Sequence, residues 1–148
     1  MTLDDEIDNL RRIPLFAIFE IGALQMLAFA GETRLLRSGD FLFQRGEESD
    51  GGFILMLGAI ALAPREARLP AQVLRPWALI GEMALVAPSL RPITARAVEP
   101  STVLKIRRAL FLQILEQHPL TAARVREFFR ERLVDFTREA ASGYEGRD

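Results

Sequence analysis

Two short stretches of the sequence decide the fold: IGEMALV at residues 80–86 and RPITARA at residues 91–97. They predict a strand end, a glycine, one helical turn, a loop and a returning strand headed by Arg91. A helical turn that opens at Gly81 presents free backbone N–H groups, which attract an anion. Arg91 can close over the same point with a planar bidentate fork, and Glu82 suits a hydroxyl donor. Phosphate and a vicinal hydroxyl form a nucleotide-like recognition set.

Around these stretches, short apolar runs alternate with Gly and Asp turn residues. This spacing is typical of an antiparallel barrel or jelly roll. The expected strands lie at residues 33–36, 41–43, 53–57, 59–63, 71–75, 91–97 and 102–106. The segment Pro64–Pro70 is expected to be a hairpin loop or a small excursion from the barrel.

The pattern at both ends of the chain has a helical period. Helices are expected at residues 2–12, 21–30, 107–117 and 119–141, the last stopping at Ser142-Gly143. We therefore predict a mainly β fold, an antiparallel jelly-roll β-barrel with flanking helices. One domain is expected over residues 1–148, with N-terminal helices in 1–31, the barrel in 32–106 and C-terminal helices in 107–141.

Composition excludes several classes of protein. The 148 residues include no cysteine and one histidine, which argues against thiolate chemistry and against a metalloenzyme on a similar jelly roll. The net charge of −1 gives no basic surplus for nucleic acid, although arginine outnumbers lysine 18 to 1. The longest apolar run, Phe53–Ala63, has 11 residues, and a membrane span needs about 18 or more. We expect a cytoplasmic protein that is not an enzyme and contacts no membrane.

The sequence resembles the cyclic nucleotide-binding domain family, as found in catabolite-activator-type regulators and in regulatory subunits of cyclic AMP-dependent kinase. The family's phosphate-binding cassette reads F-G-E-x-A-L, a spacer, then R-x-A-T-V. The residues that match it in order are Gly81, Glu82, Ala84, Leu85, Arg91 and Thr94, within a cassette at 80–95. Four further features resemble the family: the segment 13–16, the hairpin at 37–47, Gly58 and His118-Pro119.

The resemblance implies that the ligand is cyclic AMP or cyclic GMP, with no other cofactor. It implies that Arg91 pairs with the cyclic phosphate, that Glu82 binds the ribose 2′-hydroxyl, and that amides near Met83 and Ala84 complete the phosphate shell. By register along the last helix, a purine contact falls near Phe136 or Thr137. The candidate ligand-binding residues are Gly81, Glu82, Met83, Ala84, Arg91, Pro92, Thr94 and Thr137.

Three residues depart from the family pattern. Pro92 has no N–H, so it cannot donate the backbone hydrogen bond that the family directs at the phosphate. A hydrogen bond to a charged group contributes about 1.5–3 kcal/mol, so its loss weakens binding roughly tenfold to more than a hundredfold. Ile93 replaces a usual alanine, and Trp77 replaces a glycine.

Two functions follow as hypotheses. The first is a stand-alone sensor that binds a cyclic nucleotide and signals through its C-terminal helices; the second is an interaction or dimerisation module that has lost the ligand. Pro92, Ile93 and Trp77 motivate the second hypothesis. Separately, Arg91 and Glu82 could pair with each other as a structural salt bridge instead of contacting a ligand. The chain ends at Asp148, about where family transcription factors begin their DNA-binding domain, so we expect no direct DNA contact. Output is expected through an effector protein or a homodimer along the 119–140 helix.

Overall fold

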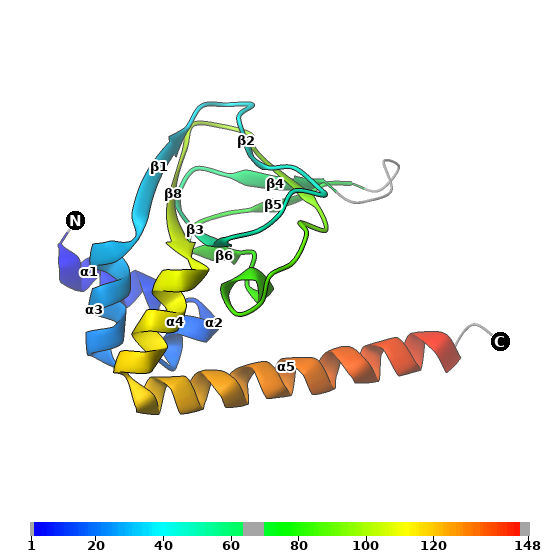
Figure 1. Cartoon of the computed structure of the whole chain (residues 1–148). Coiled ribbons are helices and arrows are strands. Elements are labelled where there is room, and N and C mark those ends of the chain that lie inside the picture. The colour runs from blue at the N-terminus through cyan, green and yellow to red at the C-terminus, as the bar shows by residue number, and fades with distance from the viewer. Residues whose placement is uncertain (1, 64–69, 146–148) are drawn as a thin grey trace.

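Helices precede and follow a block of short strands in the computed structural model, which describes residues 2–63 and 70–145, with side chains as far as Leu133 (Figure 1). The N-terminal helices are α1 (Leu3–Leu10), α2 (Pro14–Ala17) and α3 (Ile21–Ala30). The strands are β1 (Glu32–Leu36), β2 (Phe41–Phe43), β3 (Gly51–Leu57), β4 (Ile60–Ala63), β5 (Gln72–Leu74), β6 (Ala78–Ile80), β7 (Thr94–Ala97) and β8 (Ser101–Arg107). The C-terminal helices are α4 (Arg108–Gln117) and α5 (Pro119–Glu145).

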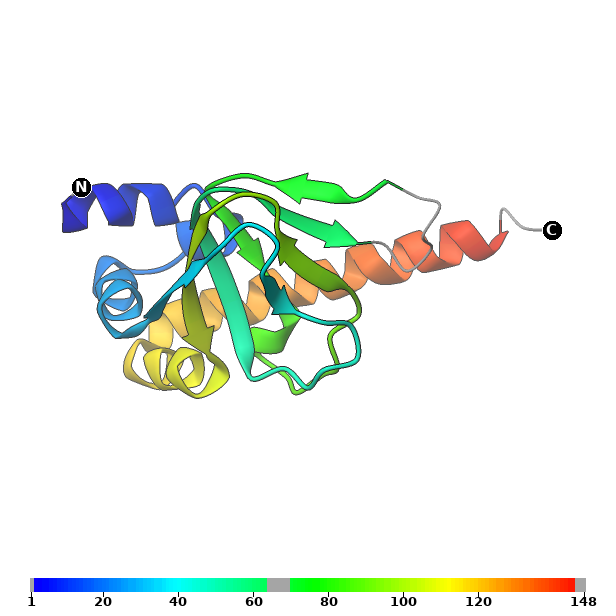
Figure 2. The same ribbon diagram turned by 90° about the horizontal axis from the view of Figure 1, so that it is seen from above.

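The described strands form two antiparallel sheets of four strands each. Their orders are β1-β8-β3-β6 and β2-β7-β4-β5. The two sheets face each other, and α5 passes beneath them (Figure 2). This arrangement confirms the predicted jelly-roll β-barrel with helices at both ends of the chain.

Alternation along β8 divides the apolar core into two layers. Val103 packs between the sheets with Phe43 and Phe53. Leu104 and Ile106, which lie on the opposite face of the same strand, pack against the helices. Successive residues of a strand point to opposite faces, so one strand serves both layers. The outer layer joins the β1-β8-β3-β6 sheet to α1, α2, α3 and α4, which ties the helices to the barrel.

Local hydrogen bonds fix where the helices begin. Thr2 and Asp5 form a capping box at the start of α1, with N···O distances of 3.0 and 3.2 Å. At the start of α5, the Glu20 carboxylate accepts hydrogen bonds from the N–H and the hydroxyl of Thr121, at 3.0 and 2.9 Å. These bonds hold the carboxylate in its charged form and lower the pKa of Glu20. The first turn of α5 is thereby anchored beside the start of α3.

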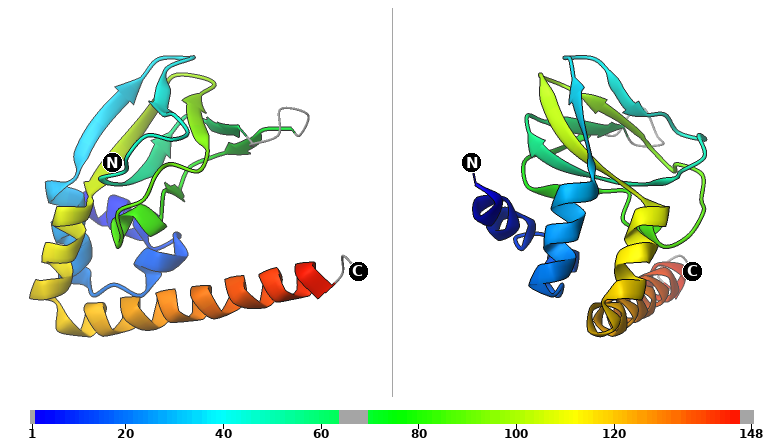
Figure 3. Two further views of the ribbon diagram at one scale, coloured as in Figure 1. Left: turned by 45° about the vertical axis from the view of Figure 1, so that its right-hand side comes forward. Right: turned by 60° about the vertical axis from the view of Figure 1, so that its left-hand side comes forward.

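Helix α5 begins at the helical end of the molecule and then runs beneath the barrel (Figures 1 and 3). Its residues Ala122 and Val125 are buried, but the described side chains beyond Val125 are half-buried or exposed. The helix continues to Glu145, so the expected stop at Ser142-Gly143 is wrong. A single glycine costs about 1 kcal/mol in a helix, which does not by itself end one. No helix among the described residues is long and apolar enough to cross a membrane.

Two short elements were predicted incompletely. Helix α2 has four residues, too few for a recognisable period, and was not predicted. The strand end predicted before Gly81 is the end of β6, whose full range Ala78–Ile80 was not predicted. The expected strand at 91–97 begins only at Thr94, after a bend at Pro92 and Ile93. Residues 64–69 of the expected hairpin loop lie outside the described residues.

Candidate functional site

The loop after β6 presents two open backbone amides. Gly81 has φ of +82°, and Glu82 follows in the right-handed helical region with φ −54° and ψ −48°. A left-handed residue followed by a right-handed one forms a concave nest of N–H groups that attracts anions. The Ala84 N–H donates to the Gly81 carbonyl at 3.2 Å, but the N–H groups of Glu82 and Met83 donate to no acceptor among the described residues.

Arg91 lies against this loop and is held from three sides. Its N–H donates to the Glu47 carbonyl at 2.8 Å, and its Nη2 donates to the Gly51 carbonyl at 2.8 Å. The guanidinium carbon lies 4.3 Å from the centre of the Phe43 ring, which is cation–π contact distance. The residue is only 5% exposed. These contacts fix the guanidinium inside the barrel, next to the loop.

Gly81 and the Arg91 guanidinium come into close contact. A Cβ atom placed on Gly81 would lie 2.7 Å from Nη1 of Arg91, nearer than real Cβ atoms come to their neighbours. Glycine therefore allows both the positive φ and the approach of the guanidinium. The Arg91 guanidinium consequently lies against Gly81, at the start of the loop that carries the open amides of residues 82–83, as the sequence predicts for Gly81 and Arg91.

The buried charge of Arg91 has no ion-pair partner among the residues that the structure describes. The nearby Asp50 carboxylate pairs instead with Lys105 at 2.8 Å and with Arg107 at 3.1 Å. Burial lowers the pKa of Arg91, while Asp50 and Glu47 act in the opposite direction. An uncompensated buried charge is costly. The site therefore favours a ligand that brings a negative charge.

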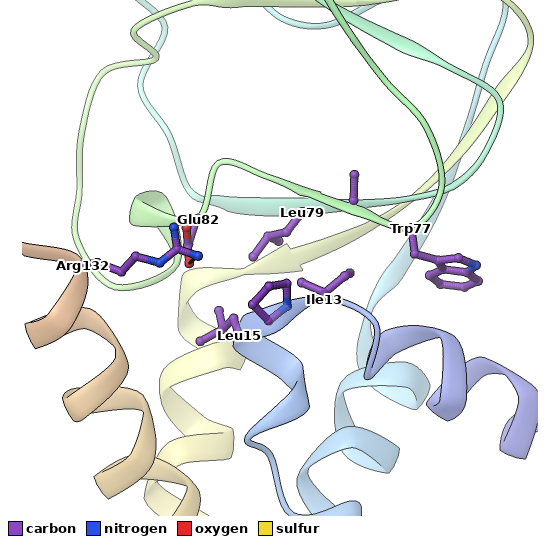
Figure 4. A pocket seen from close by; sticks show the side chains of 8 residues that line it. Ile13, Leu15, Trp77, Leu79, Glu82 and Arg132 are labelled. Atoms are coloured by element: carbon purple, nitrogen blue, oxygen red, sulfur yellow. Dashed lines mark ion pairs between the residues drawn. The ribbon is translucent and has the colours of Figure 1, made fainter. Parts of the chain in front are cut away.

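Glu82 does not lie with Arg91. Its carboxylate pairs with Arg132 of α5 at 3.5 Å, and burial raises the pKa of Glu82 although Arg132 opposes this shift. Both residues line a small cavity of about 160 Å³ between α2, β6 and α5 (Figure 4). The structural salt bridge between Arg91 and Glu82, the alternative interpretation of these two residues, is therefore absent from the described residues.

The other predicted site residues take separate positions. Met83 and Pro92 are exposed, and the Ala84 carbonyl accepts a hydrogen bond from Nε of Arg108 at 2.9 Å. The Thr94 hydroxyl accepts from the Arg45 N–H at 2.9 Å, and Thr94 faces away from the buried Ala95 toward a groove on the outer face of the sheet. Thr94 thus braces a hairpin instead of meeting Arg91. The side chain of Thr137 lies outside the described residues.

Several residues of the site were not predicted from the sequence. Phe43 and the Gly51 carbonyl hold Arg91, and Arg132 holds Glu82. Phe43 belongs to the hairpin at 37–47 that resembles a family motif, so its position in that motif could have indicated a place at the site. Arg132 lies in a run of alternating charges that is typical of a solvated helix face, and the run contains no signal for a tertiary ion pair. Ile93 packs on the barrel core, and Trp77 lines the same cavity as Glu82 and Arg132.

A family model described as the cyclic nucleotide-binding domain matches residues 33–118. The chain belongs to this family. Among solved structures, a cyclic nucleotide-binding-like protein from Brucella abortus is 35% identical, with a TM-score of 0.68 over 76% of this chain and 98% of that one. The N-terminal domain of a transcriptional regulator from Streptomyces coelicolor is 26% identical, with a TM-score of 0.80 over 90% and 95% of the two chains. This cyclic nucleotide-binding domain therefore resembles the N-terminal domain of a transcriptional regulator.

Curated relatives are much longer proteins. An NTE family protein of Mycobacterium tuberculosis is 28% identical over 111 residues, which are 75% of this chain and 19% of the relative. The lysophospholipase nte1 of Neosartorya fischeri is 24% identical over 110 residues, 72% of this chain and 7% of that protein. The chain thus spans less than a fifth of the length of these relatives.

Proposed function

We propose that the barrel binds cyclic AMP or cyclic GMP through its phosphate, and that this binding is a regulatory signal. The observation that supports the proposal most strongly is the buried Arg91, which lies without an ion-pair partner in the described structure beside the open amides of Glu82 and Met83. A cyclic phosphodiester carries one negative charge and two free oxygens, which suit one guanidinium fork and a pair of amides. Family membership points to the same class of ligand.

The role proposed here is binding without catalysis, in the cytoplasm. The phosphate would occupy the nest beside Arg91, and a ribose hydroxyl would donate to the Glu82 carboxylate. Occupancy would then be communicated through α5 to an effector protein. Two arrangements of α5 with different ligand affinities are required for such a signal.

A ligand-free interaction module is the second candidate. The contacts of Arg91 with Phe43 and with the Gly51 carbonyl favour it, because they hold the guanidinium in place without a ligand. Pro92 favours it too, since its missing N–H removes one phosphate contact. The two candidates differ in whether a nucleotide binds at all.

Isothermal titration with cyclic AMP and cyclic GMP tests the proposal. We expect binding at micromolar affinity or weaker, because Pro92 contributes no amide. Ligand at 100 times Kd should raise the free energy of unfolding by about 2.7 kcal/mol, which thermal unfolding measures. If neither nucleotide gives heat or a thermal shift at millimolar concentration, the interaction module replaces the sensor.

We also propose a homodimer along α5. Ala122 and Val125 of the apolar stripe are buried within the chain, so a dimer contact falls beyond them. There Phe129 is half-buried and Leu133 is 65% exposed. Light scattering should give twice the chain mass of 16.6 kDa, and Leu133→Glu should reduce it to that mass. A monomeric wild-type protein at high concentration would contradict this proposal.

A further inference from the structure

One ion pair connects the phosphate-binding loop with α5 among the described residues. Arg132 lies 3.5 Å from the Glu82 carboxylate; its side chain is 50% exposed and that of Glu82 is 25% exposed. The Arg132 guanidinium carbon also lies 4.8 Å from the ring centre of Phe128, one turn earlier on the same helix. The guanidinium is therefore positioned by its own helix and directed at the loop.

Apolar contacts of α5 reach as far as Phe128 and Phe129, which pack against the outer core layer. Beside the ion pair is the cavity of about 160 Å³, with Ile13, Leu15 and Leu79 among its walls (Figure 4). Arg132 therefore reaches Glu82 beside a cavity, one turn beyond the apolar contacts of Phe128. Beyond Val125, the ion pair is the polar link that the structure shows between α5 and the loop.

We propose that Arg132 couples recognition of the ligand's sugar to α5 by competing with a ligand hydroxyl for the Glu82 carboxylate. A ribose ligand replaces Arg132 at Glu82 and detaches α5, whereas a ligand without the 2′-hydroxyl leaves the ion pair intact. This inference rests on the proposed function, because it concerns a ligand whose phosphate is bound at Arg91. It makes Arg132 the residue that turns recognition of the sugar into release of the helix.

The expected effect is small and depends on the sugar. A partly exposed ion pair stabilises its arrangement modestly, so removing Arg132 should tighten binding of cyclic AMP about two- to fivefold. Binding of 2′-deoxy cyclic AMP should stay unchanged, because that ligand never displaces Arg132. Loss of the ion pair in the wild-type complex with cyclic AMP should also accelerate amide exchange in α5 beyond Val125.

The experiment compares wild type, Arg132→Ala and Arg130→Ala by titration with both ligands. Arg130 is a matched control, since it lies on the same helix and pairs only with Glu127, at 3.7 Å, among the described residues. The control should leave both affinities unchanged. Hydrogen exchange of the ligand-free proteins supplies a second measurement: α5 should exchange faster in Arg132→Ala than in Arg130→Ala.

The outcomes separate the inference from the proposed function. If wild type binds neither cyclic AMP nor cyclic GMP, the proposed function fails and the competition fails with it. If it binds cyclic AMP and the 2′-deoxy analogue, the proposed function stands and the variants test the competition alone. Weaker binding of cyclic AMP by Arg132→Ala would show that Arg132 holds the ligand, which overturns the competition. An equal change for both ligands, or unchanged exchange in α5, would overturn it as well.

Discussion

Replacing Arg91 with leucine is expected to abolish nucleotide binding without harming the ligand-free fold. Two charge-assisted hydrogen bonds of about 1.5–3 kcal/mol each are lost, so affinity should fall at least about 100-fold. Removing a buried charge that lacks an ion-pair partner should leave the ligand-free protein as stable as wild type, or more stable. Titration measures the first effect, and urea unfolding without ligand measures the second.

Arg96→Leu is the matched control for this prediction. Arg96 lies five residues further along the chain, is exposed, and its guanidinium lies 5.8 Å from the ring centre of Phe41 on the outer face of the sheet. Its replacement removes the same charge and should leave affinity unchanged. A ligand-free Arg91→Leu protein that is strongly destabilised would assign Arg91 a structural role and support the interaction module instead.

Gly81→Ala is expected to weaken nucleotide binding at least about tenfold and to lower stability by about 1–2 kcal/mol. The stability loss comes from the positive φ of +82°, which side chains other than glycine adopt at that cost. The affinity loss has a separate cause, because the new methyl group forces the Arg91 guanidinium away from the open amides. Titration and urea unfolding measure the two effects independently.

Gly46→Ala is the control that separates backbone strain at a positive φ from displacement of the Arg91 guanidinium. Gly46 has φ of +90°, and a Cβ atom there would meet nothing within 4 Å. Alanine at this position should cause the same stability loss with no change in affinity. Equal affinity of the Gly81→Ala and Gly46→Ala proteins would mean that Arg91 does not need its position against Gly81.

Local pattern predicted most of the fold. Helix α3 has the expected bounds Ile21–Ala30, and β2 has the expected bounds Phe41–Phe43, because period and turn residues mark both. Only the end of β6 before Gly81 was predicted, since the three residues after Pro76 and Trp77 show no alternation that would mark its start. Helix α5 continued past its expected end, because the cost of one glycine does not decide a helix end.

The positions of site residues that follow from backbone conformation were predictable from the sequence. The directions of side chains that follow from tertiary packing were less predictable. Gly81 follows β6 directly and Arg91 lies three residues before β7. The two come together because the chain returns past the glycine, which leaves room for the guanidinium. The direction of the Glu82 side chain depends on Arg132, fifty residues later, and on where α5 crosses the barrel. Successive strand residues face opposite sides, so Thr94 faces outward because Ala95 faces the core. The expected contact between Thr94 and the ligand could have been checked against this alternation.

The anchoring of α5 near its start makes the helix a lever. The Glu20–Thr121 hydrogen bonds and the buried Val125 place the pivot in its first two turns. At 1.5 Å per residue, Arg132 lies about 10 Å beyond Val125 and Glu145 about 30 Å beyond it. A shift at Arg132 is therefore amplified about threefold at Glu145. In the proposed function, this larger movement at the end of α5 is the one that an effector protein would contact.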